Sequence, residues 1–116
     1  MAVDIRQRDD VVIFKPKGKV IGRSVRELST AINDESAKIS GSPKFLFDFA
    51  DVSMMDSSGL GTLLGAHVSI LQKGGRVGVI NVSEKNVKSL IIRSRLISTF
   101  EHFGSEDEAV ADLASG

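Results

Sequence analysis

The chain has 116 residues, which fits a single domain, and its hydrophobic fraction of 41% is enough for one compact core. Fifteen Lys and Arg balance fifteen Asp and Glu, so no strong positive field exists to attract nucleic acid or an anionic membrane surface. The absence of cysteine excludes disulfides and thiolate metal sites, and no signal peptide or membrane-spanning apolar run is found, so a soluble cytoplasmic protein is expected.

The first half of the chain predicts a hairpin, a helix and a buried strand. Alternation over residues 3–7 and the apolar run 11–14, which ends near Pro16 and Gly18, predict two antiparallel strands joined by a polar turn. Ser24 and Glu27 match a capping box at the start of a helix. The apolar positions expected on its inner face are Val25, Leu28, Ile32 and Ile39. Residues 44–49 are apolar nearly throughout, which is typical of a central strand covered on both faces.

The second half predicts three more helices that alternate with strands. A helix over residues 57–73 is expected to bury Leu60, Leu63, Leu64, Val68 and Leu71, and Gly74-Gly75 supplies its stop signal. A strand follows at 76–81. Ser83 is a candidate cap for a third helix, with Val87, Leu90 and Ile91 inward. A short strand is expected at 97–103, and Ser105 with Glu108 forms a capping box for a last helix that buries Val110 and Leu113.

This β-β-α-β-α-β-α-β-α order predicts an α/β fold with a mixed, largely parallel sheet of about five strands. No repeat or linker interrupts the chain, so residues 1–116 are expected to form one domain. In such sheets the functional crevice tends to lie where a strand ends and a helix begins. The segment 50–61, between the buried strand and the longest helix, is therefore the first candidate for a site.

Serines, glycines and one carboxylate gather in this segment. Ser57 and Ser58 are good helix caps, and the free amides and dipole of a helix start can hold a phosphate at small cost to the fold. Gly59 and Gly61 are poor helix formers, and their bare backbone would let another surface approach. Asp56 either stabilises the helix terminus or orients the serine hydroxyl, and the sequence does not choose between these roles. A capped helix start without further function is the plain alternative.

The string Met55-Asp56-Ser57-Ser58-Gly59-Leu60-Gly61, followed by Leu63-Leu64-Gly65, resembles the signature of STAS domains, and most closely that of the anti-sigma factor antagonists. The resemblance covers essentially the whole chain. It implies a STAS-like fold with the helices packed mainly on one face of the sheet. One position departs from the family, because Gly18-Lys19-Val20 is followed by Ile21 where many antagonists carry Asp.

The resemblance also implies a switch. Ser57 would be phosphorylated by an anti-sigma factor that is itself a serine kinase with a histidine-kinase-like ATPase fold, and a PP2C-type phosphatase would reset it. Unphosphorylated protein would bind the anti-sigma factor and release the sigma factor for transcription. Ser58 is left open as a second modified residue. The residues expected to contact the partner are Met54, Met55, Asp56, Ser57, Ser58, Gly59, Gly61, Thr62 and Gly65.

Other functions were weighed against this one. The same fold serves as a regulatory subunit of transport ATPases or as a transporter-associated module. A serine hydrolase needs Gly-x-Ser-x-Gly with an acid and a histidine, but Met55 replaces the first glycine and only His67 and His102 are present. The glycines also fail the dinucleotide-binding pattern. We therefore expect a monomeric, non-enzymatic protein without metal or cofactor.

Overall fold

The computed structural model describes residues 2–116, and its first two strands form the predicted hairpin. Strands β1 (Ala2–Arg8) and β2 (Val11–Val20) pair antiparallel, from Ala2 opposite Lys17 to Arg8 opposite Val11. β2 runs beyond its predicted end, through Pro16 and Gly18. It is bordered by three other strands and is the longest strand of the sheet.

Three parallel strands extend the sheet from β2. They are β3 (Lys44–Asp48), β5 (Arg76–Ile80) and the two-residue β6 (Glu101–His102), giving the order β1-β2-β3-β5-β6. A sixth strand, β4 (Val52–Met55), pairs in parallel with the end of β2. The mixed, mostly parallel sheet is as predicted, but β4 was missed because four residues are too few to show a strand pattern.

β2 changes its parallel neighbour at Gly18. Residues 11–14 pair with β3, whereas Gly18, Lys19 and Val20 pair with β4, with a register shift between Gly18 and Lys19. Gly18 has φ +84°, which a residue with a side chain rarely adopts, and its N–H donates to the Asp51 carbonyl at 2.9 Å. This bulge bends the strand end toward the segment that precedes the second long helix.

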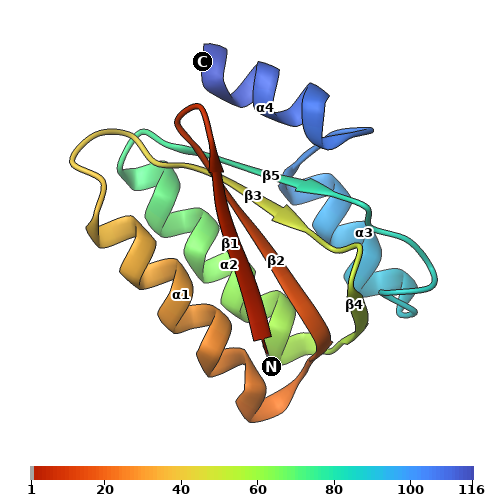
Figure 1. Cartoon of the computed structure of the whole chain (residues 1–116). Coiled ribbons are helices and arrows are strands. Elements are labelled where there is room, and N and C mark those ends of the chain that lie inside the picture. The colour runs from red at the N-terminus through yellow and green to blue at the C-terminus, as the bar shows by residue number, and fades with distance from the viewer. Residues whose placement is uncertain (1) are drawn as a thin grey trace.

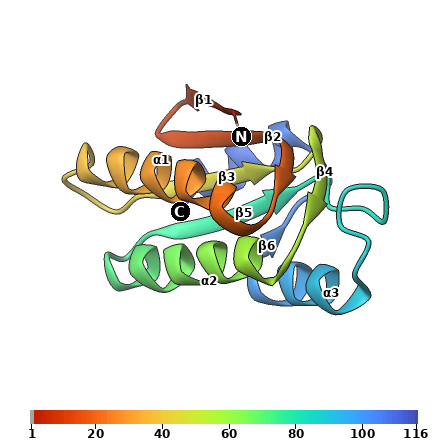
Figure 2. The ribbon, with the colours of Figure 1, turned by 90° about the horizontal axis from the view of Figure 1, so that it is seen from below.

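The helices cover both faces of the sheet unequally (Figures 1 and 2). α1 (Val25–Ala37), α2 (Ser57–Gln72) and α3 (Leu90–Thr99) contribute Leu28, Ile32, Leu63, Ile70 and Leu96 to one large core cluster. On the opposite face, α4 (Glu106–Ser115) buries Ala109, Val110 and Leu113. These three residues pack with Val11, Ile13, Leu46 and Ile80 of the sheet. The prediction that the helices lie mainly on one face is confirmed.

The buried face of α2 differs in part from the predicted one. Val68 and Leu71 are 56% and 50% exposed, and the buried positions of this helix are Gly59, Leu63 and Ile70. Leu63 is buried as predicted, and Leu60 and Leu64 are partly buried against the core, so only Val68 and Leu71 were wrongly expected to face inward. The predicted stop is confirmed, since Gly74 has φ +76° and the N–H of Gly75 bonds to the Ile70 carbonyl at 2.9 Å.

The third helix starts later than predicted. Its cap is Ser89 and not Ser83, and Leu90 and Ile91 are 66% and 77% exposed. The buried Asn86 explains this, because its carbonyl accepts the Ser83 N–H and its amide donates to the Phe49 and Asn81 carbonyls. The predicted strand at 97–103 shrinks to β6, since residues 97–99 belong to α3.

Two predicted capping boxes have different outcomes. Ser105 accepts from the Glu108 N–H at 3.2 Å, as predicted for α4, while the Glu108 carboxylate accepts from the Gly104 N–H. Ser24 precedes α1, but its hydroxyl makes no capping bond to that helix. It accepts the Ile21 N–H at 3.3 Å and donates to the Lys19 carbonyl at 3.1 Å, so it fastens a turn of 3-10 helix, Gly22–Ser24, to the end of β2.

Ion pairs hold α4 to the sheet at the end remote from residues 50–61. Arg6 and Arg8 of β1 both bond to Glu106, and Arg8 also reaches Asp107 at 2.9 Å. The hydrogen bond from Arg6, followed by the bond from Arg8, holds the pKa of Glu106 below its ordinary value. These contacts anchor the first turn of α4. Among residues 2–116, no helix combines the length and apolarity needed to cross a bilayer.

Candidate partner-binding site

Asp56 is the residue on which the start of α2 is built. It is the helix N-cap, with extended backbone at φ −109°, and one carboxylate oxygen accepts the N–H groups of Ser58 and Gly59 at 3.0 and 3.1 Å. Its other oxygen accepts the Gly22 N–H at 3.1 Å. Of the two roles that the sequence left open, Asp56 therefore stabilises the helix terminus, and it also ties α2 to the loop after β2.

Ser57 and Ser58 are the first two residues of α2 rather than its cap, and both are exposed. Neither hydroxyl is held by another group of residues 2–116. Both hydroxyls are therefore accessible from solvent. The two first-turn amides that were expected to accommodate a phosphate already bind Asp56, so a phosphate on Ser57 would lie beside a carboxylate and project outward.

The three glycines of α2 have different surroundings. A Cβ on Gly59 would lie 2.6 Å from the Val20 carbonyl oxygen and 3.0 Å from the Met55 side chain, so the end of β2 requires a glycine there. A Cβ on Gly61 or Gly65 would meet nothing within 4 Å. The fold therefore explains Gly59, but it does not explain Gly61 and Gly65, whose bare backbone faces outward.

Gly61 and Gly65 border a groove of about 270 Å³ between α1 and α2. α2 contributes Thr62, Ala66 and Ser69 to it, and α1 contributes Ser29, Asn33 and Ser36. The lining is mostly small and polar, and Lys73 closes one end by donating to the Ser36 hydroxyl at 2.7 Å. Sequence reasoning found the α2 side of this groove but not the α1 side, because Ser29 and Asn33 have no unusual local pattern.

The two methionines before the site point in different directions. Met54 is 42% exposed on β4, whereas Met55 is 5% exposed and belongs to the core. Met55 and the buried Gly59 therefore support the site from within and do not form part of its outer surface. The accessible members of the predicted contact set are Met54, Asp56, Ser57, Ser58, Gly61, Thr62 and Gly65.

The position that departs from the family pattern borders the site. Ile21 is half-buried next to Gly22, whose N–H binds Asp56. Gly22 has φ +51°, so the chain turns sharply there and presents this N–H toward α2. No local pattern indicates this contact, because Gly22 and Asp56 are 34 positions apart in the chain.

The histidines do not form a hydrolase site with Ser57. His67 is ten residues further along the same helix, a rise of about 15 Å. Its ring packs on Phe100 at 4.7 Å between centroids, and burial there lowers its pKa. His102 is exposed on β6 at the far side of the sheet. Within residues 2–116, neither histidine bonds to Ser57, so neither is placed as a general base for that serine.

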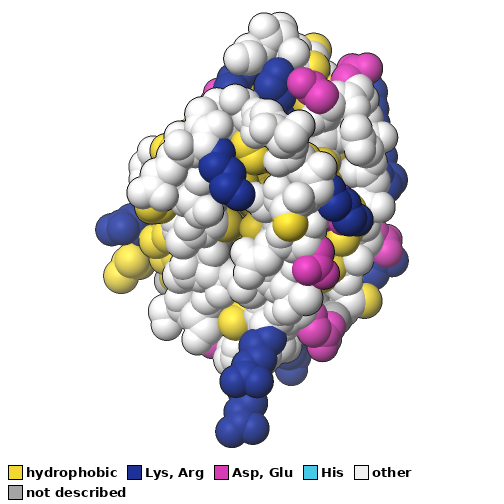
Figure 3. All heavy atoms as spheres, turned by 90° about the vertical axis from the view of Figure 1, so that its left-hand side faces the viewer, with side chains coloured by type: hydrophobic (Ala, Val, Ile, Leu, Met, Phe, Trp, Pro, Cys, Tyr) yellow, Lys and Arg dark blue, Asp and Glu magenta, His cyan; other side chains and the backbone are white. Residues whose placement is uncertain are grey.

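The face of the molecule that carries α1 shows no block of one charge sign (Figure 3). In the view of the face with α1, Lys, Arg, Asp and Glu side chains are dispersed over a largely uncharged surface (Figure 3). This agrees with the zero net charge of the chain.

A long β2, a short β4 and an Asp-capped α2 with exposed serines at its start define the class of domain to which this chain belongs. The STAS domain family model matches residues 2–109, and the chain is a member of the STAS domain family.

Solved structures of anti-sigma factor antagonists share the fold over nearly the full chain. SpoIIAA in its unphosphorylated form has a TM-score of 0.75 at 20% identity, over 99% of both chains. An anti-sigma factor antagonist from Mycobacterium paratuberculosis has a TM-score of 0.79 at 21% identity, over 97% of this chain and 92% of that one. The phosphorylated form of Bacillus SpoIIAA has a TM-score of 0.73 at 20% identity, over 96% and 98%.

Proposed function

We propose that this protein is a cytoplasmic anti-sigma factor antagonist that works as a phosphorylation-controlled binding switch, with Ser57 as the modified residue. Unphosphorylated, it binds an anti-sigma factor with serine-kinase activity, and the sigma factor is released. Phosphorylated at Ser57, it dissociates, and a PP2C-type phosphatase restores the binding form. The observation that carries the proposal is an exposed serine at the first position of α2, beside outward-facing glycines that the fold does not require.

Added charge is the physical basis of the switch. A phosphoserine carries nearly two negative charges at neutral pH, and Asp56 already occupies the nearby amides. If the partner presents a negative group about 6 Å away, each unit charge pair repels by roughly 3 kcal/mol at an effective dielectric of about 20. Screening at an exposed site reduces this figure, and a loss of at least about tenfold in affinity is expected.

The contact surface explains why the partner should be sensitive to position 57. Ser57, Ser58, Gly61 and Gly65 lie on the first three turns of α2, and the groove toward α1 continues the same surface. A partner surface that packs on the bare glycine backbone would be held close to the Ser57 hydroxyl. A phosphate there therefore excludes the partner by size as well as by charge.

The test is incubation with the cognate kinase and ATP, followed by mass spectrometry of the peptide around residue 57 and binding titrations of both forms. Ser57→Ala should abolish modification and leave binding within about twofold, whereas Ser57→Asp should weaken binding. Ser58→Ala is the matched control and should leave phosphorylation of Ser57 intact. Equal affinity of the phosphorylated and unphosphorylated forms for the partner would refute the switch. Modification of Ser58 alone would make Ser58, and not Ser57, the switch residue.

Co-purification separates this function from the other use of the fold. An ATPase of the histidine-kinase type supports the antagonist role. Recovery of a membrane transport ATPase, with no phosphorylation of Ser57, would instead support a transporter-associated regulatory subunit.

A further inference from the structure

We infer that the free edge of β1 is a self-association surface, through which two copies of this chain pair their β1 strands antiparallel around a twofold axis at Ile5. β1 ends the strand order and pairs only with β2 among the described strands. It carries no proline or bulge that would block addition of a strand. This inference is independent of the proposed function, because β1 lies outside the site at the start of α2, and it replaces the monomeric state expected from the sequence.

The hydrogen-bonding pattern of the hairpin shows which residues are free to bond. Val3 is opposite Pro16, which has no N–H, so Val3 and Pro16 form a non-hydrogen-bonded pair. Pairs alternate along antiparallel strands, so Val3, Ile5 and Gln7 direct their N–H and C=O groups to the open edge. A second β1 centred on Ile5 places Val3 opposite Gln7 and Ile5 opposite Ile5 of the second copy. Each of these pairs can exchange two backbone hydrogen bonds.

The charges on β1 select this register. With Ile5 on the axis, Asp4 is opposite Arg6 of the second copy, and Arg6 is opposite Asp4. These are non-hydrogen-bonded positions, where side chains approach most closely. Registers shifted by two residues keep the hydrogen-bond pattern, but one opposes Asp4 to Asp4 and the other opposes Arg6 to Arg6. Only the register centred on Ile5 places two pairs of opposite charges across from each other and no pair of like charges.

The two charged side chains of β1 are accessible, and each already has a partner of opposite charge within its own chain. Asp4 and Arg6 have side-chain exposures of 57% and 48%. Within one chain, Asp4 pairs with Lys17 at 3.0 Å and Arg6 pairs with Glu106. Pairing two copies would therefore produce a row of four charges, Lys17, Asp4, Arg6 and Glu106, with every neighbour of opposite sign.

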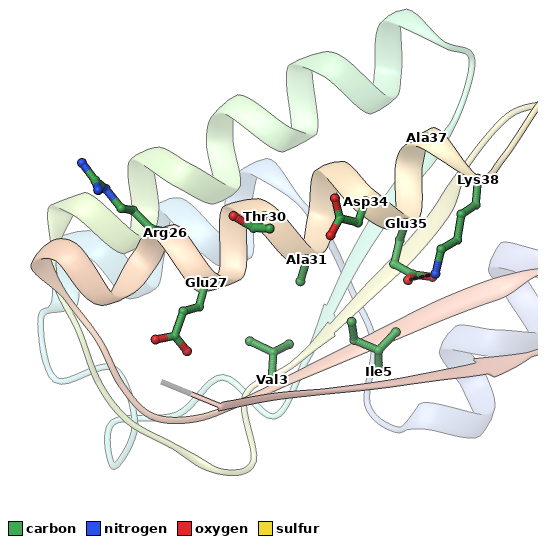
Figure 4. A pocket seen from close by; sticks show the side chains of 10 residues that line it. All are labelled: Val3, Ile5, Arg26, Glu27, Thr30, Ala31, Asp34, Glu35, Ala37 and Lys38. Atoms are coloured by element: carbon green, nitrogen blue, oxygen red, sulfur yellow. Dashed lines mark hydrogen bonds and ion pairs between the residues drawn. The ribbon is translucent and has the colours of Figure 1, made fainter.

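Apolar surface on the other face of β1 adds to the contact. Val3 and Ile5 point toward α1 and form the floor of a groove of about 750 Å³, with Ala31 above them (Figure 4). Ile5 is 40% exposed, an unusual feature for an isoleucine in a strand. Pairing would bring the two Ile5 side chains together and join the two grooves into one apolar floor.

Charge reversal in separate copies tests the proposal. Sedimentation velocity of the wild type from about 10 μM to about 1 mM should show a reversible dimer, the range expected for a contact smaller than a standard interface. Asp4→Arg alone opposes arginines, and Arg6→Asp alone opposes aspartates, so each should weaken self-association at least about tenfold. An equimolar mixture of the two variants regains both attractive pairs and should dimerise within about threefold of the wild type.

Two further variants control for changes in folding and net charge. Arg95→Asp on the exposed part of α3 makes the same charge change as Arg6→Asp and should leave dimerisation unchanged. Ile5→Pro removes an outward N–H without touching the bonds to β2, and it should abolish the dimer while circular dichroism shows an intact fold. A wild type that stays monomeric throughout, single variants that dimerise normally, or a mixture that fails to associate would each overturn the proposal. If β1 instead pairs with an extended segment of another protein, the purified wild type forms no dimer in this experiment, and that result also counts against the proposal.

Discussion

Gly59 and Gly61 lie two residues apart in α2, yet they serve different purposes. A Cβ at Gly59 would lie 2.6 Å from the Val20 carbonyl oxygen, whereas a Cβ at Gly61 would meet only solvent. Gly59→Ala should therefore destabilise the protein by about 1–3 kcal/mol through overpacking. Gly61→Ala should stabilise it by up to about 1 kcal/mol through helix propensity, while weakening partner binding.

Urea unfolding and a binding titration of both alanine variants check this prediction. The informative result is a difference between the two variants, in which Gly59→Ala loses stability and Gly61→Ala loses affinity for the partner. Gly65→Ala is a second exposed variant and should behave like Gly61→Ala. If both exposed variants keep full affinity, the bare backbone of α2 does not form the contact surface.

Asp56 joins two parts of the chain with one carboxylate, and its two roles can be separated. Asp56→Ala loses both the helix cap and the bond to Gly22, which should cost about 2 kcal/mol. Asp56→Asn keeps only one oxygen, so it can serve the cap or the Gly22 N–H but not both. We expect the free energy of unfolding to fall in the order wild type, Asp56→Asn, Asp56→Ala, measured in urea. Equal stability of the wild type and Asp56→Asn would show that the second bond, to Gly22, contributes nothing.

At the scale of elements, α4 is held to β1 by Glu106, and this attachment should depend on pH. The pKa of Glu106 is lowered in the folded protein, first by the hydrogen bond from Arg6. Its stabilising effect is therefore present above the ordinary glutamate pKa and is lost as the pH falls through the lower folded value. Because the side chain is partly exposed, the effect is modest.

Thermal unfolding of the wild type and of Glu106→Gln over a pH series measures this effect. The difference in melting temperature should be largest near neutral pH and should close below about pH 4. Glu84→Gln is the control, because its ion pair with Arg93 is long, at 3.7 Å, and Glu84 is 87% exposed. A difference between wild type and Glu106→Gln that stays constant with pH would mean that Glu106 acts through packing and not through its charge.

Elements with local signals could be predicted from the sequence. The hairpin, the buried β3, the glycine stop after α2 and the Ser105 cap each depend on residues close together in the chain. β4 could not be predicted, since it exists only because the end of β2 lies beside it. The start of α3 depends on Asn86, whose amide bonds to the distant Phe49 carbonyl.

The site shows the same difference between features with a local sequence signal and features that depend on distant contacts. Ser57 and Ser58 were placed correctly at a helix start, because the serine-glycine pattern is local. The cap itself belongs to Asp56, and its bond to Gly22 depends on how β2 ends. The inward position of Met55 follows from the pairing of β4 with β2, which the sequence does not display.

At the scale of the whole molecule, β2 links the two ends of the domain. Its first half lies between β1 and β3 near the ion pairs of α4, and its last residues lie beside β4 and under α2. Both core clusters contain residues of β2, with Val12 and Phe14 in one and Val11 and Ile13 in the other. β1, β3 and β4 pair directly with this strand, and both core clusters are built in part on its side chains.

This shared strand has a consequence for biosynthesis. β1 and β2 leave the ribosome before any of their later neighbours, and a two-stranded hairpin is at best marginally stable in water. β3 later pairs with β2, but the α4 residues that cover Val11 and Ile13 lie about 100 residues further along the chain and follow roughly 5–20 seconds later at ordinary rates of translation. During that interval this face of the hairpin has no cover, so the nascent hairpin is the segment where chaperones should bind.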